Sequence, residues 1–116
     1  MNKQPFLSTF VYAAKGLKLA FRERNFKLHI ISALVVTVLG FYCKITKGEW
    51  VAVLLCIALV TSLEIVNTAI EEVVNLVSPE FNEKAGRIKD LAAAAVLFAS
   101  IIALITGLII FLPHLY

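Results

Sequence analysis

The feature that most restricts the fold of this chain is an apolar run from Trp50 to Leu63 that continues to Val77 without a glycine or a proline. As one helix from about residue 49 to 77 it is on the order of 43 Å long, more than the roughly 30 Å hydrocarbon core of a bilayer. Its second half nevertheless carries polar side chains at helical spacing, namely Glu64, Asn67, Glu71 and Asn75. At about 100° per residue these four fall within about 80° of one another and form one polar stripe, with Glu72 to its side.

Ionisable groups inside a membrane span are unfavourable, by on the order of 3 kcal/mol each at mid-bilayer, and usually face other helices or water. Glu64 lies about 22 Å along the predicted helix, within lipid depth, whereas Glu71 and Asn75 lie near the interface. The polar stripe is therefore the first candidate for a functional site.

Composition supports a membrane protein, because 60% of the 116 residues are hydrophobic and the mean hydropathy is +0.89. We predict an all-α fold in a single domain, residues 1–116, with no removable signal peptide. Three spans are expected at about 28–43, 49–77 and 89–112. An amphipathic surface helix is expected at about 5–21, where Phe6, Phe10, Leu17 and Phe21 recur at helical spacing. Ser78-Pro79 should end the second span, and residues 80–88 should form a polar loop.

The third span begins with four alanines, Ala92 to Ala95, and continues with Ala99, Ser100 and Ala103. Small residues at this spacing let helices approach closely in lipid. We therefore expect this surface to pack against the polar stripe.

Lysine and arginine predict the orientation in the membrane. Nine of them lie before the first span and in the loop after the second, and only two, Lys44 and Lys47, lie in the loop after the first. We expect a multi-pass membrane protein with a cytoplasmic N-terminus and an external C-terminus. The carboxylate end of the second span then faces the cytoplasm.

Charged side chains from three segments meet at this predicted interface: Glu23 before the first span, Glu71 in the second, and Lys89-Asp90 at the mouth of the third. Converging carboxylates suit Mg²⁺, which takes hard oxygen ligands and commonly keeps substrate phosphates. The deeper Glu64 is placed to accept a proton from an alcohol. These are the parts needed for phosphoryl transfer to a lipid hydroxyl.

The residues alone leave alternatives open. The polar stripe also suits an interhelical hydrogen-bond network or a small proton-coupled membrane transporter that uses Glu64. The transporter is disfavoured because the carboxylates lie toward one side rather than at the midplane. Neither common Gly-rich phosphate loop is present in the sequence. Cys43 and Cys56 are interpreted as buried thiols, and His29 as a cap of the first span rather than a metal ligand.

Several stretches carry a resemblance to a known family. They are Glu64-Ile-Val-Asn-Thr-Ala-Ile-Glu-Glu-Val-Val, the Gly86-Arg-Ile-Lys-Asp loop, and the Ala-rich stretch that ends at Leu97. They closely resemble the prokaryotic integral-membrane diacylglycerol kinases, a family that includes the undecaprenol kinases of Gram-positive bacteria. The stretch Glu23–His29 looks more like the undecaprenol kinase branch. The resemblance runs from Lys15 to His114.

This resemblance implies a homotrimer with active sites shared between protomers, Mg²⁺ as cofactor, ATP as phosphate donor and undecaprenol or diacylglycerol as lipid acceptor. No nucleic-acid partner is expected. By position, Glu64 matches the family's catalytic base, and Glu23 and Glu71 match the carboxylates that bind the metal of MgATP. Asn67 and Asn75 match residues that support the site. The implied nucleotide-binding residues are Tyr12, Glu23, Glu71, Glu80, Phe81, Asn82, Lys89 and Asp90.

Three features differ from the family pattern. Asn75 stands where the family usually has aspartate, which removes one negative charge from the rim of the site. Pro5 lies where proteobacterial members have an arginine, and Lys3 is the only nearby basic residue. Matching Glu23 to those members needs a one-residue gap. Neither substitution touches Glu64 or Glu71, so we expect an active enzyme.

Overall fold

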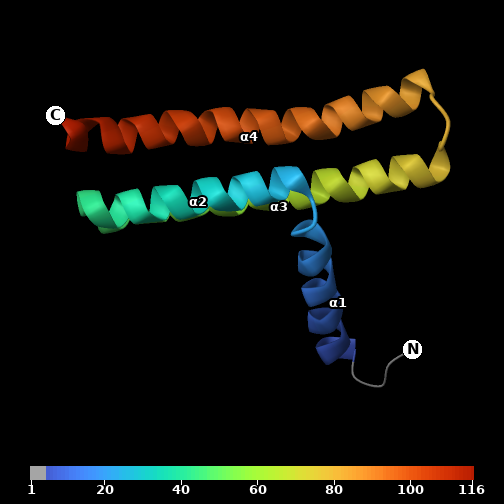
Figure 1. Cartoon of the computed structure of the whole chain (residues 1–116), viewed down its shortest axis with the longest axis horizontal. Coiled ribbons are helices and arrows are strands. Elements are labelled where there is room, and N and C mark those ends of the chain that lie inside the picture. The colour runs from blue at the N-terminus through green and yellow to red at the C-terminus, as the bar shows by residue number, and fades with distance from the viewer. Residues whose placement is uncertain (1–4) are drawn as a thin grey trace.

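The computed structural model describes residues 5–116, and over that range it is an all-helical protein (Figure 1). Its helices are α1 (Pro5–Ala20), α2 (Arg24–Cys43), α3 (Lys47–Val77) and α4 (Glu83–Leu115). The helices α2, α3 and α4 are long and apolar enough to cross a membrane. The predicted architecture of three spans preceded by a short helix is therefore confirmed. Lys3 falls outside the described residues, and the single-domain assignment stays a prediction.

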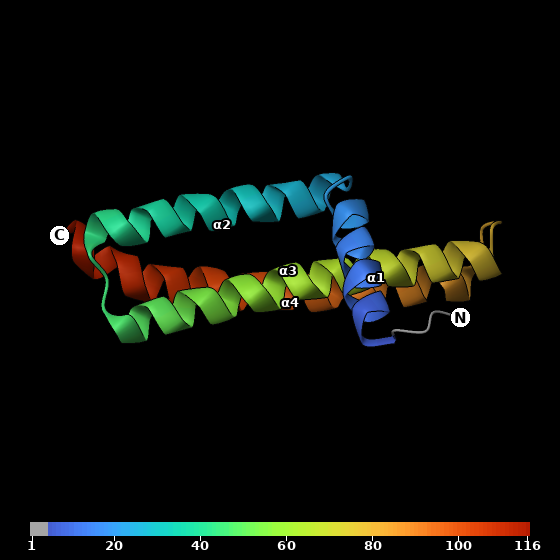
Figure 2. The ribbon, with the colours of Figure 1, turned by 90° about the horizontal axis from the view of Figure 1, so that it is seen from below.

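The three long helices lie side by side and alternate in direction (Figures 1 and 2). The most extensive packing is between α3 and α4, and α2 packs more on α3 than on α4. At the end that carries the α3–α4 connection, both of these helices extend beyond α2 (Figure 1). The projecting end of α3 carries the exposed part of the polar stripe, Glu71 and Asn75.

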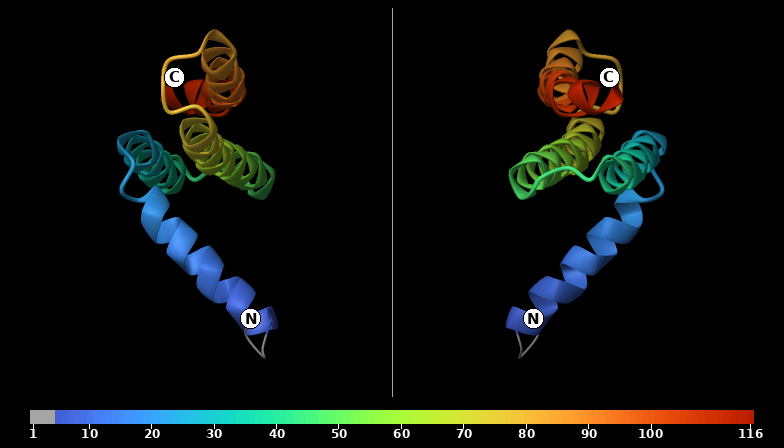
Figure 3. Two further views of the ribbon diagram at one scale, coloured as in Figure 1. Left: turned by 90° about the vertical axis from the view of Figure 1, so that its right-hand side faces the viewer. Right: turned by 90° about the vertical axis from the view of Figure 1, so that its left-hand side faces the viewer.

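The first helix, α1, projects away from the bundle and crosses the direction of the spans (Figures 1 and 3). A helix in this orientation lies in the membrane interface when its neighbours span the bilayer. Its apolar residues Phe6, Phe10 and Leu17 are exposed on this chain and available to lipid. The junction with α2 is fixed by an edge-to-face contact between Phe21 and the buried Phe26, whose ring centroids are 4.9 Å apart.

The tight turn between α2 and α3 places these helices antiparallel. Lys44 adopts a left-handed conformation with φ 53°, and its N–H bonds back to the carbonyls of Gly40 and Phe41. Trp50 then folds over Gly40: a Cβ at position 40 would lie 2.7 Å from the indole ring. Glycine is needed here because of this close approach, not because of its backbone angles.

Thr46 begins α3 through a capping box. Its hydroxyl accepts from the Glu49 N–H at 3.2 Å, and the Glu49 carboxylate accepts from the Thr46 N–H at 2.9 Å. Both bonds satisfy N–H groups that otherwise lack a partner at a helix start.

We expect Thr46→Ala to lower the free energy of unfolding by about 1 kcal/mol, because the capping hydroxyl is lost. Thermal unfolding in detergent measures the change. Ser62→Ala, at an exposed position inside α3, is the matched control and should be neutral or slightly stabilising. Equal effects of the two substitutions would contradict a capping role.

The fourth helix is longer at both ends than the sequence indicated. It begins at Glu83 rather than near Lys89, because the Asn82 side chain caps it by accepting from the N–H groups of Lys84 and Ala85 at 2.9 and 3.2 Å. It also continues through Pro113 to Leu115. A proline in the last turn removes only one terminal hydrogen bond, so the helix tolerates it there. By contrast, α3 ends at Val77, immediately before Ser78-Pro79, as predicted.

Candidate active site

The polar stripe on α3 lies partly inside the bundle. Glu64 is 4% exposed and Asn67 is 6% exposed, whereas Glu71 one turn further on is exposed. The Asn67 amide donates from Nδ2 to Glu71 Oε1 at 2.9 Å, so two members of the polar stripe are joined directly. The polar stripe therefore runs along one face of α3 from a buried carboxylate, Glu64, to an exposed one, Glu71.

A small polar pocket of about 270 Å³ surrounds the buried end of the polar stripe, where α2, α3 and α4 meet. It is lined by Asn25, His29, Glu64, Asn67, Ala93, Val96, Leu97 and Ser100. The residues from α4 belong to its alanine-rich start, and Val96 and Ala99 are buried there. The predicted packing of this small-residue surface against the polar stripe is confirmed, and it encloses Glu64.

Asn67 has one unsatisfied polar atom. Its Oδ1 is buried and has no hydrogen-bond partner among the described residues. An unpaired buried acceptor lowers stability by about 1–3 kcal/mol. Because Asn67 lines the polar pocket, a bound molecule or water with a donor group would satisfy it.

His29 of α2 lies beside Glu64, with Nε2 3.7 Å from Oε2. This separation is too long for a hydrogen bond, and it is an ion pair when the imidazole is protonated. Sequence reasoning assigned His29 to helix capping and missed this contact. The contact depends on how α2 is rotated on α3, which has no signature in the local sequence.

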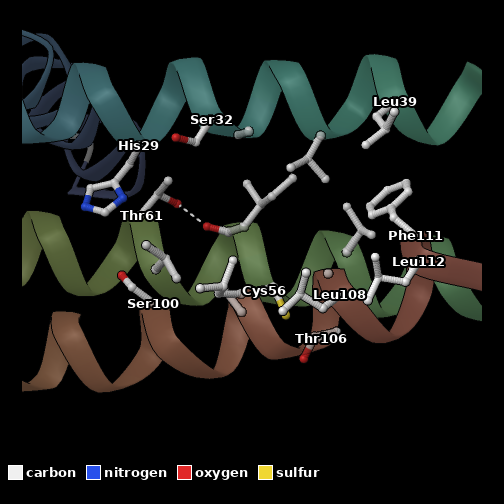
Figure 4. Close-up of a pocket in the computed structure, with 18 of the residues that line it drawn as sticks. His29, Ser32, Leu39, Cys56, Thr61, Ser100, Thr106, Leu108, Phe111 and Leu112 are labelled. Atoms are coloured by element: carbon white, nitrogen blue, oxygen red, sulfur yellow. Dashed lines mark hydrogen bonds between the residues drawn. The ribbon is translucent and has the colours of Figure 1, made fainter. Parts of the chain in front are cut away.

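A larger apolar cavity of about 590 Å³ lies between the same three helices and runs from His29 toward Leu39, Phe111 and Leu112 (Figure 4). Its wall is mainly aliphatic. Three of its hydroxyls donate to carbonyls of their own helices: Ser32 to Leu28, Thr61 to Ile57 and Thr106 to Ile102, at 2.9, 2.7 and 2.9 Å. The cavity therefore offers hydrocarbon contacts and suits an apolar chain.

At the exposed end of the polar stripe, α3 and α4 are joined by Lys89 Nζ, which donates to Asn75 Oδ1 at 2.6 Å. An aspartate at position 75 would neutralise this lysine, whereas the amide holds it without removing its charge. Asn75 thus leaves the positive charge of Lys89 in place at this end of the polar stripe.

The other predicted nucleotide-binding residues lie around this end of α3 and α4. Glu80 and Phe81 are exposed in the short α3–α4 connection, and Asp90 is exposed on α4. Asn82 belongs to the same connection, but its side-chain oxygen is used in capping α4. The single chain does not bring Tyr12 to this group, because α1 projects away and the Tyr12 ring faces Lys15 of its own helix at 5.8 Å.

The two predicted metal ligands are exposed and come from different segments, the α1–α2 connection and α3. Glu23 precedes α2 in an extended conformation, and Glu71 is oriented by the Asn67 amide. The part of the chain that the structure describes holds no group of three or more His, Cys, Asp or Glu side chains arranged for a metal. Mg²⁺ needs no such group, since one or two carboxylates together with substrate phosphates commonly bind it. The donor chemistry of Glu23 and Glu71 fits that role.

Three apolar helices long enough to span a bilayer, with a buried carboxylate in a polar pocket among them, place this chain among multi-pass membrane proteins with an internal polar site. Comparison with known proteins narrows the class. The family model described as prokaryotic diacylglycerol kinase matches residues 11–111. The chain belongs to the prokaryotic diacylglycerol kinase family.

Among individual relatives, the chain is 40% identical to an undecaprenol kinase of Bacillus subtilis (strain 168) over 111 residues, covering 95% of this chain and 90% of that protein. It is 36% identical to a diacylglycerol kinase of Escherichia coli (strain K12) over 104 residues, covering 89% and 85%. It is 38% identical to a diacylglycerol kinase of a Synechocystis species over 111 residues, covering 94% and 63%.

Proposed function

We propose that this protein is a lipid kinase that transfers the γ-phosphate of ATP to the hydroxyl of a membrane lipid alcohol. The observation that carries the proposal is the position of Glu64, buried in the polar pocket, whose lining shares His29 and Ser100 with the apolar cavity. The names of the relatives, undecaprenol kinase and diacylglycerol kinase, support the same reaction class and indicate the two candidate acceptors. Undecaprenol is the preferred candidate because Glu23–His29 resembles that branch.

In the proposed reaction, Glu64 accepts the proton of the lipid hydroxyl while the hydroxyl oxygen attacks the γ-phosphorus. The bond from that phosphorus to the β–γ bridging oxygen breaks, and ADP leaves with the electron pair. The products are a lipid phosphate and ADP. The lipid's hydrocarbon chain occupies the apolar cavity, which holds the hydroxyl near the carboxylate. Lys89 contributes positive charge toward the phosphates.

Glu23 and Glu71 would hold Mg²⁺ bound to the nucleotide. When bound, the ion neutralises negative charge on the phosphates. The Asn67 amide keeps the Glu71 carboxylate in place for this role through its 2.9 Å hydrogen bond.

The proposal includes an orientation and an assembly. The N-terminus and the α3–α4 connection face the cytoplasm, supported by nine lysines and arginines on that side against two on the other. The expected location is the bacterial cytoplasmic membrane. The assembly is the homotrimer that the family resemblance implies, with sites shared between protomers. A neighbouring protomer then completes the nucleotide side around Tyr12.

Phosphate transfer from γ-labelled ATP in lipid–detergent micelles, with undecaprenol and diacylglycerol in parallel, tests the activity. We expect labelled lipid phosphate from at least one alcohol, with undecaprenol favoured. A reaction without added alcohol is the control. Absence of labelled lipid with both alcohols would contradict the proposal and favour the alternative of a proton-coupled transporter.

A further inference from the structure

His29 occupies the junction between the two cavities. It lines the polar pocket and the apolar cavity, and the other residue common to both linings is Ser100 of α4. In Figure 4 the imidazole projects from α2 into the space beside α3, near Thr61, and Ser100 lies on α4. We call this shared boundary, His29 and Ser100, the neck; Glu64 lines the polar pocket on one side of it.

We propose that His29 is a positioning residue for phosphoryl transfer: its imidazole holds the Glu64 carboxylate at the neck where the lipid hydroxyl must arrive. This inference rests on the proposed lipid kinase function. It adds a residue to the site that neither the polar stripe nor the family motif identifies.

The separation of His29 and Glu64 supports this role. The Nε2 atom faces Oε2 at 3.7 Å, so a shift of less than 1 Å brings the two atoms to hydrogen-bond distance. Catalytic contacts of this kind are often long without substrate and shorten when it binds. An N–H directed at Oε2 would leave the other carboxylate oxygen, Oε1, to accept the proton of the lipid.

The surroundings give the contact further importance. The Glu64 side chain is 5% exposed, and His29 approaches it from α2, which also lines the apolar cavity with Ser32, Ala33, Val36 and Leu39. A buried carboxylate needs a donor to fix its orientation, because it has lost the water that would otherwise solvate it. Asn67 directs its own amide N–H to Glu71 instead.

The chain contains a matched control for this contact. At the opposite end of the bundle His114 Nε2 lies 3.5 Å from Glu49 Oε1, and its side chain is 29% exposed compared with 25% for His29. His114→Leu therefore removes a similar histidine–glutamate pair far from the polar pocket.

The experiment compares wild type with His29→Leu, His29→Gln and His114→Leu, each assayed for kcat, for KM of MgATP and of the lipid alcohol, and for thermal unfolding. We expect His29→Leu to lower kcat roughly 100-fold with an unchanged KM for MgATP, because misplacement of a reacting group by about 1 Å has an effect of that size. His29→Gln keeps an N–H donor at similar reach and should return kcat to within about tenfold of wild type. His114→Leu should match wild type in kcat.

Two outcomes would overturn the inference. One is wild-type kcat in His29→Leu. The other is a loss of kcat in His29→Leu that His29→Gln does not restore, together with a higher KM for MgATP and a lower unfolding temperature. That pattern is expected of a structural residue. The wild-type measurement separates this inference from the lipid kinase function on which it rests. If wild type and His29→Leu transfer phosphate equally well, only the role of His29 is rejected.

Discussion

Glu64→Gln is expected to abolish phosphate transfer while leaving the protein folded. The substitution keeps the size and the hydrogen-bonding shape of the side chain but removes its ability to accept a proton. Loss of a general base lowers kcat by about 10²- to 10⁴-fold. Because MgATP is proposed to bind at the exposed end of the polar stripe, its affinity should not change.

The loss of activity should not be accompanied by a loss of stability. Glu64 is 4% exposed and its neighbour His29 is 3.7 Å away, so the carboxylate is poorly compensated where it lies. A buried charge without a hydrogen bond is unfavourable, and a neutral amide of similar volume avoids that desolvation cost. We therefore expect Glu64→Gln to unfold at the same temperature as wild type or higher, the pattern of a residue retained for activity at the expense of stability.

The assay is labelled phosphate transfer together with thermal unfolding and equilibrium binding of MgATP. Glu64→Asp provides the second variant, since it keeps a carboxylate one methylene further from the reacting oxygen and should keep partial activity. Transfer at the wild-type rate by the glutamine variant would remove Glu64 from the role of base. Equal losses in both variants, with lower unfolding temperatures, would assign it a structural role.

The sequence predicted the features that depend on one helix at a time. The period of the polar stripe placed Glu64 and Asn67 on one face, and the structure buries both. The end of α3 just before Ser78-Pro79 was also predicted correctly, because proline cannot continue a helix there. Hydropathy over long windows identified α2, α3 and α4 because each segment must satisfy its own backbone in lipid.

The errors lie at polar helix ends and between helices. Residues 83–88 read as loop because they are polar, yet Asn82 followed by Glu83 is a capping signal that carries the helix six residues further back. The position of His29 had no comparable signal. Its approach to Glu64 and to the neck depends on three helices packing at particular rotations, and local spacing contains no information on that.

The second large effect is expected for Glu71. Glu71→Gln removes one negative charge from the rim and keeps a carbonyl oxygen that can accept the Asn67 amide N–H, the bond that measures 2.9 Å. If Glu71 holds Mg²⁺, the ion concentration for half-maximal transfer should rise at least about tenfold, the range seen when the environment of a metal site is altered. Activity at saturating Mg²⁺ should recover at least in part.

Glu71→Ala separates charge from hydrogen bonding, because it also leaves the Asn67 Nδ2 group without its acceptor. It should show the same shift in Mg²⁺ dependence and an added loss of activity at saturating Mg²⁺, since Asn67 would no longer be fixed beside Glu64. Glu72→Gln is the matched control: it removes the same charge from the adjacent exposed position, off the polar stripe, and should leave the Mg²⁺ dependence unchanged. An unaltered Mg²⁺ requirement in Glu71→Gln, with activity lost only in Glu71→Ala, would show that Glu71 serves the site by orienting Asn67 and that another group binds the ion.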